Sequence, residues 1–120
     1  MPAPSDKLKG HRILVVEDEY FIANDLKQAL LNNGAAVVGP AATVADAMDL
    51  MAEGRVIDGA VLDINLRGEA VYPVADRLIE ADIPFVFLTG YDARAIPAKY
   101  AAVVRCEKPL AMARLIGALI

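Results

Sequence analysis

The spacing of hydrophobic residues changes at regular intervals along this chain. Short apolar runs alternate with longer stretches in which apolar residues recur every three or four positions. The first spacing is typical of buried strands, and the second of helices that cover a sheet. The pattern predicts strands over residues 12–16, 35–39, 57–62, 84–88 and 102–105. It predicts helices over 21–31, from 43 onward, and over 71–79, 93–100 and 110–120.

Turn and cap residues support these limits. Asn33-Gly34 is a typical helix stop, and Thr43 followed by Asp46 resembles a capping box that opens the second helix. Pro97 falls inside the fourth predicted helix, so we expect that helix to be short and mobile.

Five successive strand–helix units predict an α/β fold with a five-stranded, doubly wound parallel sheet. Parallel strands need right-handed crossovers, and these crossovers put helices on both faces of the sheet. In such sheets, ligands and reactive groups gather where the strands end at their carboxyl edge. The strand ends are therefore where we expect the chemistry.

Length and charge limit the functions that this chain can have. Its 120 residues, 57% hydrophobic and 23% charged, suit one domain over 1–120, with a flexible arm over 1–10 and no output domain. The net charge of −4 argues against a nucleic-acid partner. No apolar run reaches the roughly 20 residues of a membrane helix. We therefore expect a cytoplasmic protein with no membrane contact, whose partners are proteins or metal ions.

Polar residues follow four of the five predicted strands. Glu17 and Asp18 follow the first strand, Asp63 the third, Thr89 the fourth and Lys108 the fifth. Three carboxylates crowded at one edge would repel by about 3 kcal/mol per pair, at roughly 5 Å and an effective dielectric constant of about 20. A bound cation would relieve this repulsion, and oxygen ligands at an open site suit Mg²⁺. We expect Asp18 and Asp63 to be direct ligands.

The same residues are sufficient for phosphoryl transfer. This reaction asks little covalent chemistry of a protein beyond a nucleophile, a metal ion and groups that bind the phosphoryl oxygens. Asp63 is the candidate nucleophile. Lys108 would neutralise the phosphoryl oxygens and Thr89 would hydrogen-bond to them, so the site needs no general base.

This arrangement resembles the receiver domain of two-component response regulators, and the resemblance covers nearly the whole chain. It implies the flavodoxin-like (βα)5 fold and a phosphoacceptor at Asp63. It also implies that Asp18 binds Mg²⁺ directly, that Glu17 binds it mainly through water and that Asn65 offers its backbone carbonyl. The phosphodonor would be a sensor histidine kinase. The chain would not be a metabolic enzyme, because its only reactions would be self-catalysed phosphorylation and dephosphorylation of the aspartate.

Two departures from the family pattern concern the output. Residues 84–91 resemble the motif of a receiver subgroup nicknamed FAT GUY, whose members are often single-domain proteins, but Leu88 replaces its alanine. Arg105 stands three positions before Lys108, where receivers usually carry an aromatic ring that rotates inward as the threonine moves. A guanidinium is always charged and replaces a buried ring poorly. We expect a different readout, in which Tyr91 and the fourth helix shift.

The sequence is thus interpreted as a single-domain response regulator that switches or relays a signal through protein contacts. A phosphate sink or shuttle in a multi-component phosphorelay is the alternative. An unknown downstream protein would bind the fourth and fifth helices. The last helix either caps the core or offers a partner or homodimer surface, through Met112, Leu115, Ile116, Leu119 and Ile120.

Three rival functions fit the residues less well. A phosphatase of the haloacid dehalogenase type needs a second aspartate two residues after its nucleophile, where this chain has Asn65. A flavin binder would hold a phosphate in the loop after the first strand, but residues 17–19 are all acidic and repel phosphate. A receiver that binds partners without being phosphorylated would lack part of the acidic site, and here the acidic site is complete.

Overall fold

The computed structural model describes residues 6–89, 96–107 and 112–119. Within these residues, a parallel five-stranded sheet has the strand order β2-β1-β3-β6-β7. The strands are β1 (Arg12–Val16), β2 (Ala36–Ala41), β3 (Gly59–Asp63), β6 (Phe85–Thr89) and β7 (Val104–Glu107). The helices are α1 (Tyr20–Asn32), α2 (Val44–Ala52), α3 (Tyr72–Glu80) and α4 (Met112–Leu119), and η2 (Ala98–Tyr100) is a single 3-10 turn. The predicted doubly wound α/β fold is confirmed.

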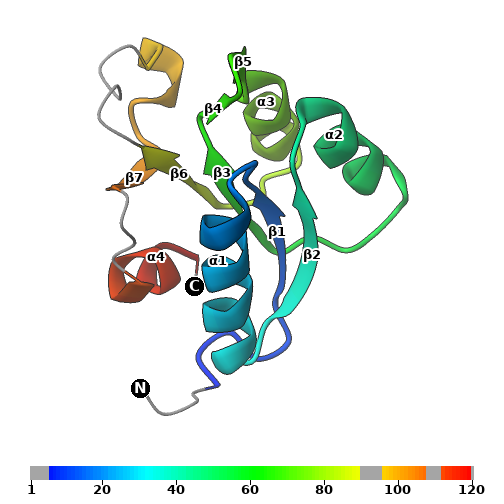
Figure 1. Cartoon of the computed structure of the whole chain (residues 1–120), viewed down its shortest axis with the longest axis vertical. Coiled ribbons are helices and arrows are strands. Elements are labelled where there is room, and N and C mark those ends of the chain that lie inside the picture. Colours follow the sequence, from blue (N-terminus) through cyan, green and yellow to red (C-terminus); the bar gives the residue numbers. More distant parts are fainter. Residues whose placement is uncertain (1–5, 90–95, 108–111, 120) are drawn as a thin grey trace.

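Each face of the sheet has its own hydrophobic core. One core lies between the sheet and α2 and α3, and includes Leu62, Leu78 and Phe87. The other lies between the sheet and α1 and α4, and includes Val61 and Leu26. Neighbouring residues of β3 therefore point into different cores, as side chains on a strand must. Figure 1 shows α1 and α4 on one side of the strands and α2 and α3 on the other.

The central strands are continuous apolar runs in the sequence because helices cover both of their faces. All five residues of β3 are buried, as are the last four of β1. β1 and β3 lie side by side, with Val16 opposite Leu62, and β3 pairs on its other side with β6, so that Asp63 lies opposite Leu88. This register brings the carboxyl ends of the three strands to one edge.

The predicted cap and stop residues have the expected roles. The Thr43 hydroxyl accepts a 3.0 Å hydrogen bond from the Asp46 N–H and caps α2. Gly34, just past α1, has a φ of +91° and donates its N–H to the Leu31 carbonyl. A side chain there would also crowd the backbone of Lys9, at 3.1 Å from its Cα.

A short hairpin after β3 was absent from the sequence prediction. Its strands, β4 (Asn65–Leu66) and β5 (Glu69–Ala70), pair antiparallel around a two-residue turn. Arg67 and Gly68 form that turn with φ of +53° and +89°. Positive φ at both central residues gives the twist that a tight hairpin needs.

Part of the predicted flexible arm over 1–10 packs against the fold. Leu8 is fully buried in the same core as Leu26 and Leu30, and its N–H donates to the Asn33 carbonyl at 2.8 Å. Residues 6–10 therefore pack against the end of α1, because Leu8 gains a covered apolar site there. Residues 1–5 lie outside the described part of the chain.

The two C-terminal helix predictions have different outcomes. Of the predicted helix over 93–100, the structure describes only residues 96–100, where Pro97 precedes the turn η2. In α4, Leu115, Ile116 and Leu119 are buried within the chain itself. These three side chains cap the core, so they do not supply the surplus apolar surface that suggested a homodimer. No described helix has the combination of length and apolarity required to cross a membrane.

Candidate acidic site at the carboxyl edge of the sheet

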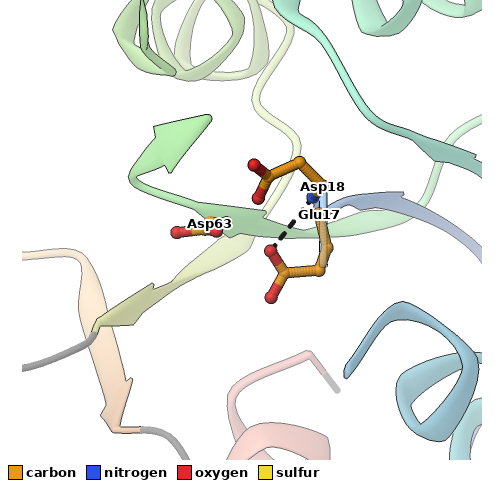
Figure 2. A group of neighbouring side chains, drawn as sticks. All are labelled: Glu17, Asp18 and Asp63. Atoms are coloured by element: carbon orange, nitrogen blue, oxygen red, sulfur yellow. Dashed lines mark hydrogen bonds between the residues drawn. The ribbon is translucent and has the colours of Figure 1, made fainter. Parts of the chain in front are cut away.

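Three carboxylates meet where β1 and β3 end. Glu17 and Asp18 directly follow Val16, the last residue of β1, and Asp63 is the last residue of β3. Each of the three offers a carboxylate oxygen within 4.8 Å of the others. Figure 2 shows them at the ends of the two neighbouring strands. The predicted convergence of Glu17, Asp18 and Asp63 is therefore seen in the structure.

Burial makes this cluster electrostatically unfavourable by itself. Glu17 is 2% exposed, Asp63 is 6% exposed, and the Asp18 side chain is 15% exposed. Charges about 5 Å apart repel by about 3 kcal/mol per pair at an effective dielectric constant of about 20. A dense group of carboxylates at a functional edge therefore calls for a compensating positive charge.

Backbone N–H groups orient two of the carboxylates. Glu17 Oε2 accepts hydrogen bonds from the N–H of Asp18 at 3.1 Å, drawn in Figure 2, and of Glu19 at 3.5 Å. Asp63 Oδ1 accepts a hydrogen bond from the N–H of Asn65 at 3.2 Å. These hydrogen bonds fix the directions of the two carboxylates.

The donor set fits a hard divalent cation. Three carboxylates at a partly open edge provide oxygen ligands only, as Mg²⁺ prefers, and an edge of this kind leaves room for water and phosphate oxygens. The expected contribution of the Asn65 backbone carbonyl stays a prediction. The Asn65 side chain has a different role, because its Oδ1 accepts the Gly68 N–H at 2.7 Å and closes the hairpin.

One positive residue beside this cluster was not predicted from the sequence. Arg67, in the hairpin turn, places its Nε 3.3 Å from Asp18 Oδ2, although 80% of the Arg67 side chain is exposed. The available signal was the pair Arg67-Gly68 four residues after Asp63, which suits a tight turn. Nothing in the hydrophobic pattern indicates that the turn folds back over the carboxylates.

Of the remaining predicted site residues, the structure describes Thr89 in β6 and Arg105 in β7. Thr89 is 3% exposed and ends β6, one residue after the Leu88 that pairs with Asp63. Lys108 and Tyr91 lie outside the described residues, so their predicted roles stay predictions. Arg105 is exposed and pairs with Phe87. Its guanidinium is not buried beside Thr89, as its permanent charge leads one to expect.

A known protein is similar to this chain in sequence. No protein-family model matches the sequence. An uncharacterized transcriptional regulatory protein, YbdJ of Bacillus subtilis (strain 168), is 30% identical over 85 residues, which are 69% of this chain and 36% of YbdJ. The matched region thus spans about a third of that curated relative.

Solved structures match over nearly the full length. SdrG from Sphingomonas melonis Fr1 is 40% identical, with a TM-score of 0.80 over 91% of this chain and 95% of SdrG. A second SdrG structure, of its BeF3-activated conformation, is 37% identical with a TM-score of 0.76 over 96% of this chain and 97% of that one.

A response regulator receiver protein from Sinorhizobium medicae WSM419 is 28% identical, with a TM-score of 0.77 over 93% of both chains. These comparisons concern the whole fold, and membership of the FAT GUY subgroup stays a prediction. Because the likeness to SdrG and to this response regulator receiver protein extends over almost all of each chain, this chain belongs to the response regulator receiver domains.

Proposed function

We propose that this chain is a single-domain response regulator that accepts a phosphoryl group on Asp63 from a sensor histidine kinase. The observation that carries the proposal is the cluster of Glu17, Asp18 and Asp63, whose carboxylate oxygens lie within 4.8 Å of one another at the carboxyl edge. An edge that concentrates three negative charges favours a chemistry that uses a metal ion and transfers an anionic group.

Glu17, Asp18, Asp63 and the backbone carbonyl of Asn65 would hold Mg²⁺. When bound, the ion supplies positive charge that offsets the phosphoryl oxygens. Held by these carboxylates, the ion would also lower the repulsion among them.

Asp63 would act as the nucleophile. One of its carboxylate oxygens forms a bond to phosphorus while the phosphorus–nitrogen bond of a phosphohistidine breaks, and the released imidazole nitrogen takes up a proton. The hydrogen bond from the Asn65 N–H to Asp63 Oδ1 supports this role, since it fixes the direction of the carboxylate. Holding the nucleophile in line with the transferred group is a large part of the catalysis of such reactions.

Thr89 and Lys108 would bind the phosphoryl oxygens. Thr89 is nearly fully buried at the end of β6, which is hydrogen-bonded to β3. A hydroxyl held in this way can respond to the new charge with a small local movement. Lys108 would provide the compensating ammonium group.

The likeness to SdrG supports a switch of this kind. A structure of SdrG is described as its BeF3-activated conformation. We extend the same response to this chain: phosphorylation of Asp63 would change the surface around Tyr91 and the last helix, where a downstream protein binds. The same site would also serve a phosphate sink or shuttle.

The direct test is phosphorylation by a small-molecule phosphodonor, followed by intact mass spectrometry. The parent protein should gain the mass of one phosphoryl group in the presence of Mg²⁺ and show little gain in EDTA. Asp63→Asn should gain none, while Asp6→Asn, in the N-terminal segment, is the matched control and should behave as the parent does. Equal mass gain by the parent and the Asp63→Asn variant would disprove the proposal.

A further inference from the structure

Arg67 contacts the acidic edge, and the proposed phosphoryl transfer does not use it. Its Nε lies 3.3 Å from Asp18 Oδ2, while most of its side chain is exposed. The contact joins a residue of the hairpin turn to a carboxylate that the proposed function gives to Mg²⁺. We propose that Arg67 competes with the divalent cation for Asp18, so that binding of the metal ion displaces the guanidinium.

The hairpin holds Arg67 over the carboxylates. β4 and β5 pair as Asn65 with Ala70 and Leu66 with Glu69, and the Asn65 side chain accepts the Gly68 N–H at 2.7 Å. The hairpin starts two residues after Asp63, so the turn has a fixed position relative to the cluster. Arg67 itself has a φ of +53°, a conformation that arginine rarely adopts.

Electrostatic repulsion makes the two partners of Asp18 compete. A guanidinium offsets part of the negative charge of the cluster and so stabilises it. A divalent cation on the same carboxylate would lie close to the guanidinium, and like charges repel at such distances. Since 80% of the Arg67 side chain is exposed, it can swing into water when the cation binds.

The competition would set a threshold for metal binding. Mg²⁺ must displace Arg67 from Asp18, so its apparent affinity is lower than the carboxylates alone would give. In return, the acidic edge keeps a compensating charge when the divalent cation is scarce. This inference rests on the proposed metal site and adds a residue that tunes its affinity.

The test compares Mg²⁺ binding by isothermal titration calorimetry in the parent, Arg67→Gln, Arg67→Lys and Arg77→Gln. Arg67→Gln removes the charge at similar length. We expect this variant to bind Mg²⁺ roughly three- to tenfold more tightly, a modest change because water screens an exposed ion pair. Arg67→Lys keeps the charge and should stay near the parent. Arg77, an exposed arginine on α3, is the matched control for loss of one positive charge.

Thermal unfolding provides the second measurement. In EDTA, Arg67→Gln should melt below the parent, because the three carboxylates lose their compensating charge. In saturating Mg²⁺ the two melting temperatures should converge, since binding to the folded state stabilises the tighter binder more. If the parent binds Mg²⁺ and Arg67→Gln binds it no more tightly, the competition is disproved and the metal site stands. If the parent itself does not bind Mg²⁺, the proposed metal site falls, and the competition with it.

Discussion

Tyr100 shows how one buried side chain can fix a short segment to the rest of the fold. It is 2% exposed, and its hydroxyl donates a 2.6 Å hydrogen bond to Asp76 Oδ1 on α3. Its ring stacks on Tyr72, with centroids 4.9 Å apart and an interplanar angle of 12°. Lys99 adds an ion pair, with its Nζ 3.0 Å from the same Asp76 oxygen. The turn η2 is thereby attached to α3 by a ring contact and two polar contacts.

Replacing Tyr100 by phenylalanine should keep the ring packing and remove the hydrogen bond. We expect Tyr100→Phe to lower the free energy of unfolding by about 1 kcal/mol, the usual net value of such a bond. Urea denaturation followed by circular dichroism measures this difference. The exposed Tyr20→Phe is the matched control and should change stability little. A Tyr100→Phe variant as stable as the parent would mean that the bond contributes nothing net.

The same hydrogen bond predicts a dependence on pH at the alkaline end. Burial, followed by the hydrogen bond to Asp76, raises the pKa of Tyr100 above its ordinary value of 10.0. The unfolded chain then loses its tyrosine proton first, so stability falls as pH rises above 10.0. Because Tyr100→Phe lacks this group, its stability should fall less steeply with pH in that range. Urea denaturation at a series of alkaline pH values compares the two slopes, and parallel slopes would contradict the prediction.

At acid pH the dependence is opposite, and stability falls as the pH decreases. The hydrogen bond from Tyr100, and after it the one from Lys99, lowers the pKa of Asp76 below its ordinary value of 3.8. The stability that these contacts give is present at a pH above 3.8, and it is lost as the pH falls through the lowered pKa of Asp76. The polar contacts of Tyr100 are therefore best satisfied between these two ends of the pH scale.

At the scale of single elements, α2 depends on Thr43, the residue that precedes it and caps it. The Thr43 hydroxyl accepts the Asp46 N–H, one of the N–H groups at a helix start that have no partner within the helix. We expect Thr43→Ala to lower the free energy of unfolding by about 1 kcal/mol. Thr43→Asp retains an oxygen that can accept the bond and should stay near the parent. Equal losses in both variants, measured by urea denaturation, would show that the cap is not the cause.

The elements also explain which predictions succeeded. β1 was predicted to the residue and β6 to within one residue, because strands covered on both faces are continuous apolar runs. β3 begins two residues later than predicted and ends one residue later. β7 begins two residues later than predicted and includes Arg105, a charged residue that interrupts the apolar pattern of an edge strand. The hairpin β4–β5 was missed because strands of two residues are too short to show an alternation.

The part of the candidate site that lies at the strand ends could be predicted from the sequence, because the strands themselves were predicted. Strand ends converge wherever a parallel sheet forms, so Glu17, Asp18 and Asp63 could be brought together from the order of the strands alone. The position of Arg67 depends on how the chain turns after Asp63. Such a turn is set by local φ angles and by the Asn65 side chain, and these leave little trace in the hydrophobic pattern.

At the scale of the whole molecule, the sheet lies between two hydrophobic cores and contributes side chains to both. A movement of β6 would change the packing of both cores, because Phe87 belongs to one and Leu88 to the other. Phe87 also contacts the ring of Tyr100, with centroids 5.8 Å apart. A displacement that begins at Thr89, two residues beyond Phe87, thus has a packed route to η2 and α3 that does not require a ring at position 105.

Arg105 has one more consequence, which concerns the open sides of the sheet. β7 and β2 are the outermost strands of the described sheet, and each has an edge with no strand beside it. An open edge invites pairing with another chain, and charged side chains and prolines discourage it. β7 carries the exposed Arg105, and β2 carries Pro40, which has no N–H to offer a further strand. We therefore expect Arg105 to disfavour edge-to-edge aggregation as well.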